Sequence, residues 1–253
     1  VLIKLHEGIS GFSYSQFSSV DGFDLRVGAG SNGEAIPYEI EHWDTGAVSY
    51  VWAQVPELST GTWVNVHWGN PLAAAQPPAY TTDSSVWRDD YAAVWHLNAD
   101  LSDASSHQAD ALSTGSLEGG GVVAGGRLFD GVDDVLTQGP GTTWYSQNMQ
   151  DMTISVWAHP TAIGGVPFGA AVDSDTTQNF GFWLNFHPFA RNLFVNIDGA
   201  VTLFGPFSLD EWHLFTLTVS NGVAFAALND MTPVQVGLLD GFAPTRQPAL
   251  GNL

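Results

Sequence analysis

The sequence predicts an all-β protein, and three observations lead to that prediction. Apolar and polar residues alternate with a period of two in segments such as 180–186 and 215–219. Turn-forming residues, including 28 glycines and 13 prolines, separate these short segments. Helical spacing occurs only briefly, at Tyr91, Val94 and Trp95, before turn residues follow. Short strands with turns between them are typical of antiparallel sandwiches and barrels.

The strand predictions follow in order along the chain, each from a run of β-branched or aromatic residues bounded by Gly, Pro, Asn, Asp or Ser. The first set is Val1–Leu5, Phe23–Val27, Tyr38–Trp43, Ala47–Val55 and Trp63–Trp68. The second set is Ala92–Leu97, Gly126–Phe129, Thr153–Ala158, Phe180–Phe186, Leu193–Ile197, Phe215–Val219 and Val223–Leu228. The glycine-rich stretch Gly115–Gly126 predicts a long surface loop.

A change of composition predicts a domain boundary. The stretch Pro71–Ser85 contains three prolines, a run of alanines and a Thr/Asp/Ser cluster, which is typical of a linker. We therefore expect a small β domain over residues 1–75, a linker over 76–90 and a larger β domain over 91–253.

The charge and the missing cysteines exclude several classes of protein. Six Lys and Arg residues against 26 Asp and Glu give a formal charge of −20, which excludes binding to nucleic acid or to an anionic membrane surface. No run of 18 apolar residues occurs, so we expect no membrane insertion. The absence of cysteine excludes disulfides and thiolate metal sites. An acidic surface is typical of salty or extracellular surroundings, and calcium sites are the alternative explanation.

The sequence lacks the motifs of the common hydrolases. A retaining glycosidase needs two carboxylates on one face, yet the chain has no Glu-x-Asp-x-x-Glu string. Gly-x-Ser-x-Gly and His-Glu-x-x-His are absent too. Glu39 and Glu41 share one face of a predicted strand, and we interpret that face as solvated. The sequence therefore predicts a protein that is not an enzyme.

Clustered aspartates in turn-rich segments are candidates for a structural Ca²⁺ site. Hard oxygen ligands at short spacing are what Ca²⁺ requires, although aspartate also caps turns through its own backbone. The candidate ligands are Asp103, Asp110, Asp130 and Asp133, with Asp134, Asp173 and Asp175 beside them.

Aromatic and amide side chains predict a carbohydrate-binding surface. If Ile154, Val156, Phe182 and Leu184 face the core, Trp157 and Trp183 point away from it. Flat indoles stack on sugar rings while amides bind hydroxyl groups. The candidate ligand-binding residues are Trp157, Trp183, Asn185 and Asn196. Burial of these tryptophans beneath a neighbouring segment is the alternative.

The first 75 residues carry five ordered motifs, among them Ile36-Pro-Tyr-Glu-Ile-Glu-His-Trp-Asp44 and Val64-Asn-Val-His-Trp-Gly-Asn70. In these motifs the segment resembles the DUF2341 family of bacterial domains. That resemblance implies an extracytoplasmic protein, in some cases one fused to a proton channel of the ExbB/TolQ/MotA type. It implies no known activity.

A second resemblance begins near residue 93. Gly126-Arg-Leu-Phe-Asp-Gly-Val-Asp-Asp134 is followed by Met152-Thr-Ile-Ser-Val-Trp157 and Glu211-Trp-His-Leu-Phe-Thr-Leu217. In these motifs the chain resembles the LamG-like jelly roll of the concanavalin A-like lectin/glucanase superfamily. The resemblance implies an antiparallel jelly-roll sandwich and a structural Ca²⁺ near residues 101–106. Such domains continue into a closing strand with an acidic pair, and we expect this one to lack that strand.

These observations lead to one main functional hypothesis and two alternatives. The main hypothesis is a non-catalytic, extracytoplasmic recognition module, located in the periplasm, at the cell surface or secreted, that binds a glycan or another surface polymer and holds a structural calcium. The first alternative is a periplasmic sensory or structural domain of an ExbB/TolQ/MotA-like channel, with a protein or the cell wall as its partner. The weaker alternative is a glycoside hydrolase.

Overall fold

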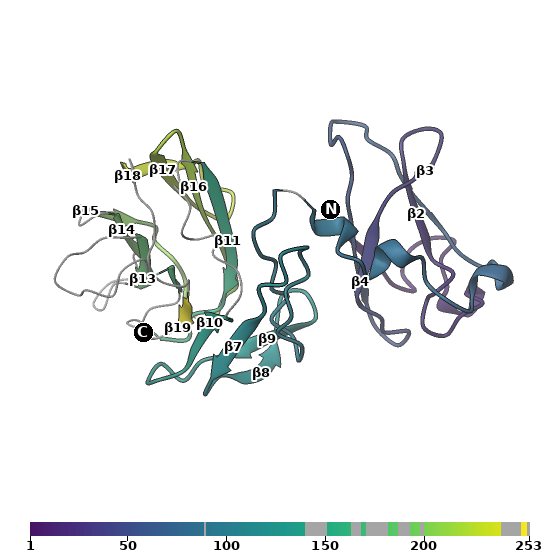
Figure 1. The fold of residues 1–253 in the computed structure, drawn as a ribbon, viewed down its shortest axis with the longest axis horizontal. Coiled ribbons are helices and arrows are strands. Elements are labelled where there is room, and N and C mark those ends of the chain that lie inside the picture. Colours follow the sequence, from purple (N-terminus) through teal and green to yellow (C-terminus); the bar gives the residue numbers. More distant parts are fainter. Residues whose placement is uncertain are drawn as a thin grey trace. The chain divides into compact units, whose positions relative to one another are not determined.

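The computed structural model describes residues 1–88, 90–139, 151–162, 168–170, 182–186, 193–197, 200–238 and 249–251. Within these ranges the regular structure consists of antiparallel strands and four short 3₁₀ helices, so the all-β prediction is confirmed (Figure 1). The 3₁₀ helices are η1 (Tyr14–Gln16), η2 (Pro71–Ala73), η3 (Ala79–Thr81) and η4 (Ser85–Trp87). Across the described ranges, no helix has the length and apolar character needed to cross a membrane.

The chain divides into two compact units. The first comprises Val1–Gln108 with Val123–Gly125, and the second comprises Ala109–Val122 with Gly126–Leu253. Within the first unit, η3 and η4 contact the strand Tyr38–His42. The segment 76–90, expected as a linker, therefore packs on a sheet of the first unit, and residues 91–108 belong to the same unit.

The first unit contains two three-stranded antiparallel sheets. Its strands are β1 (Leu2–Leu5), β2 (Arg26–Ala29), β3 (Glu34–Ala35), β4 (Tyr38–His42), β5 (Ser49–Ala53) and β6 (Val64–His67). One sheet has the order β1-β5-β4 and the other has the order β3-β2-β6. Alternate side chains of both sheets enter one buried core, which includes Leu25, Val27, Tyr38 and Val51.

Two polar groups fix the loops around this core. The Tyr14 hydroxyl donates to the Leu5 carbonyl at 2.8 Å, which ties η1 to the end of β1. Asp24 is 1 % exposed as a residue, and its carboxylate accepts backbone N–H groups of Ser18, Ser19 and Gly69 at 2.8 to 3.0 Å. Burial acts to raise the pKa of Asp24, but these backbone hydrogen bonds outweigh burial and lower it below the ordinary value.

The remaining strands form a seven-stranded, a four-stranded and a two-stranded sheet. Their orders are β15-β14-β13-β12-β19-β10-β7, β11-β16-β17-β18 and β8-β9. The bounds are β7 (Ala111–Thr114), β8 (Leu117–Gly120), β9 (Gly125–Leu128), β10 (Val135–Gln138), β11 (Met152–Ala158), β12 (Phe168–Ala170), β13 (Phe182–Phe186), β14 (Leu193–Ile197), β15 (Ala200–Phe204), β16 (His213–Ser220), β17 (Val223–Leu228), β18 (Val234–Leu238) and β19 (Ala249–Gly251).

The two larger sheets of the second unit pack against each other. β14 and β15 contact β18, and Figure 1 shows β13 to β15 facing β16 to β18. Buried side chains from both sheets form the core between them, including Val195, Phe204, Phe215, Ala226 and Val236. This arrangement buries one face of the four-stranded sheet and leaves its other face outward.

Two predictions of local structure are wrong. Ala92–Leu97 forms no strand, and among the described residues its only β-bridge joins Trp95 to Asp103. Gly115–Gly126 is not a long loop, because it contains β8 and the first residues of β9.

Candidate functional site

The outward face of the four-stranded sheet carries rows of hydroxyl groups. β11 has the register Thr153↔Thr218, Ser155↔Thr216 and Trp157↔Leu214 with β16. The hydroxyls of Thr153 and Thr218 lie 3.3 Å apart, and those of Ser155 and Thr216 lie 3.3 Å apart. We call this surface, defined by these four residues and Trp157, the hydroxyl face.

Trp157 lies at the end of the hydroxyl face and is 46 % exposed. Its position follows from strict alternation in β11, where Thr153, Ser155 and Trp157 are exposed while Ile154 and Val156 are half-buried. Among the described strands, β11 lies at the edge of its sheet and pairs only with β16. The sequence-based prediction that Trp157 points away from the core is confirmed. An exposed indole beside rows of hydroxyls offers one apolar plate and several hydrogen-bonding groups.

The other three candidate ligand-binding residues lie in the seven-stranded sheet. Trp183 and Asn185 belong to β13, and Asn196 belongs to β14. In the register Trp183 lies opposite Asn196, and Asn185 lies opposite Phe194. These three residues therefore lie in a different sheet from Trp157. Their part in ligand binding stays a prediction.

Three aspartates of the second unit converge in the loop after β9. Carboxylate oxygens of Asp130, Asp133 and Asp134 lie within 4.8 Å of one another. Asp134 Oδ2 accepts from the Asp130 N–H at 2.8 Å, and Asp130 Oδ1 accepts from the Val132 N–H at 2.8 Å. Hard oxygens so close together could hold a metal ion, and these are the ligands that Ca²⁺ prefers. Further ligands would still be required, since Ca²⁺ takes 6–8 oxygens.

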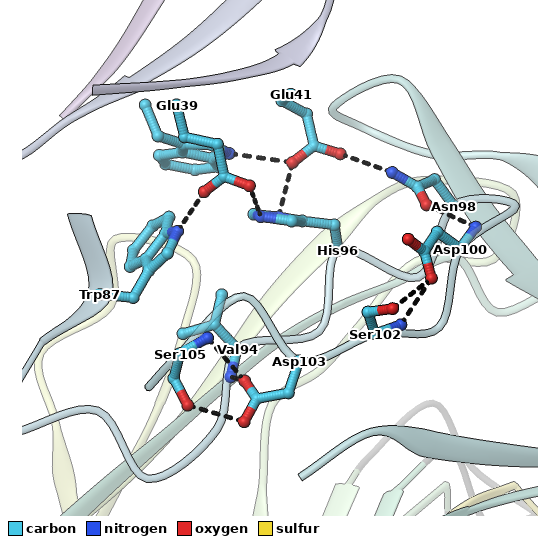
Figure 2. Close-up of polar contacts among 11 residues, drawn as sticks. Glu39, Glu41, Trp87, Val94, His96, Asn98, Asp100, Ser102, Asp103 and Ser105 are labelled. Atoms are coloured by element: carbon cyan, nitrogen blue, oxygen red, sulfur yellow. Dashed lines mark hydrogen bonds and ion pairs between the residues drawn. The ribbon is translucent and has the colours of Figure 1, made fainter. Parts of the chain in front are cut away.

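The other two candidate calcium ligands, Asp103 and Asp110, are not members of this group of three. Asp103 is buried, and its carboxylate accepts the Val94 N–H at 2.7 Å and the Ser105 N–H and hydroxyl at 2.9 and 2.7 Å. These contacts brace the loop 94–105, as Figure 2 shows. Asp110 is exposed and belongs to the second unit, whereas Asp103 belongs to the first. Asp173 and Asp175 lie outside the described residues.

A half-buried imidazole in the first unit lies between two carboxylates of β4 (Figure 2). His96 Nδ1 lies 2.6 Å from Glu41 Oε2, and Nε2 lies 3.3 Å from Glu39 Oε1. The side chains of His96 and Glu41 are 14 % and 1 % exposed. Burial acts to lower the pKa of His96, but its contacts with Glu39 and Glu41 outweigh burial and raise the pKa to about 9. The imidazole is therefore charged at neutral pH.

Neighbouring donors complete this network. Trp87 Nε1 donates to Glu39 at 2.5 Å, and Trp52 Nε1 donates to Glu41 at 3.3 Å. Asn98 Nδ2 donates to the second oxygen of Glu41 at 3.1 Å. The carboxylates of Glu39 and Glu41 thus hold Trp87, His96 and Asn98 against β4. We call the six residues (Glu39, Glu41, Trp52, Trp87, His96 and Asn98) the His96 network.

The interpretation of Glu39 and Glu41 as a solvated strand face is wrong. They do share one face of β4, but that face is covered by Trp87 and His96, both part of the first unit. A polar cavity of about 120 Å³ lies beside Glu39, lined in part by Thr81, Ser84 and Asp103. That volume suits a few water molecules and is well below the roughly 300 Å³ of a typical ligand pocket.

The comparisons with known proteins give distant likenesses. No protein-family model matches the chain, and no curated protein matches it. The structure is similar to domain 4 of AbnA, a GH43 extracellular arabinanase from Geobacillus stearothermophilus solved with arabinotriose, with a TM-score of 0.39, 15 % identity, and coverage of 60 % of this chain and 84 % of that one. It is also similar to the carbohydrate-binding module CBM66 from Bacillus subtilis, with a TM-score of 0.34, 12 % identity, and coverage of 56 % and 91 %.

Proposed function

We propose that this protein is a non-catalytic, extracytoplasmic recognition module that binds a glycan through the hydroxyl face. The exposed indole of Trp157 carries the proposal. A tryptophan that leaves 46 % of its surface in water at the end of an outward sheet face forms a flat apolar plate on which a sugar ring can stack.

The hydroxyl rows supply the polar half of the site. Ser and Thr hydroxyls both donate and accept, so they can exchange their contacts with water for contacts with sugar hydroxyls. They are held by strand pairing, with cross-strand partners at 3.3 Å, so little conformational entropy is lost when a ligand binds. A rigid polar row beside an exposed ring suits carbohydrate better than it suits an apolar partner.

The sequence resemblances fit this function. Asp130 to Asp134 and Trp157 stand in the two motifs that resemble the LamG-like jelly roll, and two packed antiparallel sheets are compatible with that architecture. On those motifs we propose a DUF2341-like domain followed by a LamG-like domain. Trp183, Asn185 and Asn196 are proposed as a second group of ligand contacts on the seven-stranded sheet.

A structural Ca²⁺ belongs to the same proposal. The residues that would hold it are Asp130, Asp133 and Asp134, because their oxygens already converge within 4.8 Å. When bound, the ion would offset the mutual repulsion of the three close carboxylates and fix the loop between β9 and β10. It is a structural ion and takes no part in chemistry.

Affinity electrophoresis in native gels tests glycan binding directly. The formal charge of −20 drives the protein toward the anode, so retardation in gels that contain laminarin, linear arabinan or xylan reports binding. We expect at least one of these polymers to retard the protein and Trp157→Ala to weaken the retardation at least about tenfold.

Trp63→Ala is the matched control, since Trp63 is 69 % exposed but belongs to the first unit. It should be retarded like the unmodified chain. Equal retardation of Trp157→Ala and the unmodified chain would refute Trp157 as the platform, and the absence of retardation by any glycan would refute the function.

A further inference from the structure

Trp157 has two exposed aromatic neighbours, His159 and Trp212, which pack on each other. β11 and β16 stay paired beyond their last register position, Ala158↔His213, because the Asp210 N–H donates to the Pro160 carbonyl at 2.8 Å. His159 and Trp212 lie between these two connections. Their ring centroids are 5.2 Å apart and their ring planes are inclined by 59°.

Strand alternation places this pair on the same side as the hydroxyl face. His213 is buried, so its neighbours Trp212 and Leu214 point to the opposite, outward side. Since Trp157 is opposite Leu214, Trp212 is the diagonal neighbour of Trp157 across the two strands. Diagonal neighbours in an antiparallel pair lie within reach of aromatic side chains. Trp212 is 39 % exposed, so its indole offers a second apolar plate.

The charges around the face select the class of ligand. The described segments 151–162 and 200–238, which supply the whole four-stranded sheet, contain no Lys or Arg. They contain four exposed carboxylates, Asp151, Asp210, Glu211 and Asp230. A uronic-acid or sulfated polymer would meet like charge, and these segments supply no Lys or Arg to compensate it. A neutral sugar chain has no such penalty.

We propose that Trp157 and the Trp212–His159 pair are two adjacent stacking positions, and that the site binds a neutral polysaccharide chain across both. This inference rests on the proposed function of the hydroxyl face. It adds that affinity depends on chain length. A single sugar can stack at one of the two positions only, whereas a longer chain can stack at both.

Calorimetric titration with neutral oligosaccharides of increasing length tests the inference. The probes are oligosaccharides of the polymer that retards the protein, from the monosaccharide to the hexasaccharide. We expect the affinity to rise at least about tenfold along the series for the unmodified chain, and Trp212→Ala to abolish most of that rise. Trp212→Phe, which keeps a flat ring, should retain it. If Trp212→Ala lowers the melting temperature, Trp212→Leu preserves apolar bulk without an aromatic face.

The outcomes separate the inference from the function it rests on. A chain-length effect that survives in both Trp212→Ala and Trp212→Leu would overturn the second stacking position while leaving Trp157 as the glycan platform. Tighter binding of polygalacturonate than of a neutral polymer would overturn the ligand class. A complete lack of binding by every probe would refute the proposed function itself.

Discussion

Replacement of His96 by glutamine should uncouple residues 87–98 from β4. The substitution removes the positive charge that lies 2.6 Å from Glu41, a carboxylate only 1 % exposed. Removal of one partner from a buried ion pair leaves an uncompensated charge and costs about 3–5 kcal/mol. The pKa of His96 gives a second measure of the same interaction. Its rise from 6.5 to about 9 corresponds to about 3 kcal/mol at roughly 1.4 kcal/mol per pKa unit.

The sign of the pH dependence follows from the direction of that rise. A pKa raised on folding stabilises the folded state fully below the unfolded value of 6.5, and this contribution is lost as the pH climbs through about 9. The unmodified first unit should therefore lose about 3 kcal/mol of stability between these two pH values. His96→Gln should start about 3 kcal/mol lower near pH 6 and show no such loss.

Hydrogen exchange in increasing urea measures this effect locally, at peptides from β4 and from residues 91–98 of the first unit. His42→Gln is the matched control, because His42 is an exposed histidine at the end of the same strand. The control should behave like the unmodified chain. A His96→Gln variant within about 0.5 kcal/mol of the unmodified chain near pH 6, or one with the same loss toward pH 9, would refute the account of the His96 network.

Two further predictions concern stability. Asp24→Asn should destabilise the first unit by about 2 kcal/mol at neutral pH, because three backbone donors lose a charged acceptor. The pKa of Asp24 is lowered on folding, so its contribution is present above the unfolded value and declines as the pH falls through the lower folded value. In urea unfolding, the variant should therefore differ less from the unmodified chain near pH 3 than near pH 7. Ca²⁺ should raise the melting temperature of the unmodified chain relative to EDTA. At a Ca²⁺ concentration a hundredfold above Kd, binding adds about 2.7 kcal/mol to the free energy of unfolding. Asp133→Asn should remove that increase; identical melting curves for the unmodified chain in Ca²⁺ and EDTA would eliminate the calcium site.

Much of the fold could be predicted from alternation alone. Val223–Leu228 has the predicted bounds, and Thr153–Ala158 differs from β11 by one residue. The outward position of Trp157 follows from the same pattern, because a period of two fixes the face of every residue in a strand. Gly115–Gly126 was mispredicted because glycine composition argues against strands, whereas Gly119 packs so closely on Leu128 in the β8–β9 pair that a side chain there would lie 2.5 Å from it.

The His96 network could not be predicted from the sequence. Residues 92–97 alternate like a strand, yet the course of this segment is set by side-chain contacts to β4. Glu41 and His96, which make one of these contacts, are 55 positions apart in the sequence. No local periodicity reports such a contact. Trp212 could not be identified as a candidate from alternation, because it precedes its strand and its exposure depends on the cross-strand pairing with β11.

Oxidative footprinting of the unmodified chain tests the central claim most directly, since it needs no substitution. The protein is oxidised with N-bromosuccinimide with and without the neutral polysaccharide that retards it, and modification of each tryptophan is read by mass spectrometry. We expect the polymer to protect Trp157 while Trp63, more exposed at 69 % but in the first unit, is oxidised at an unchanged rate. Oxidation of Trp157 at the same rate with and without the bound polymer would contradict the hydroxyl face as the glycan-binding site.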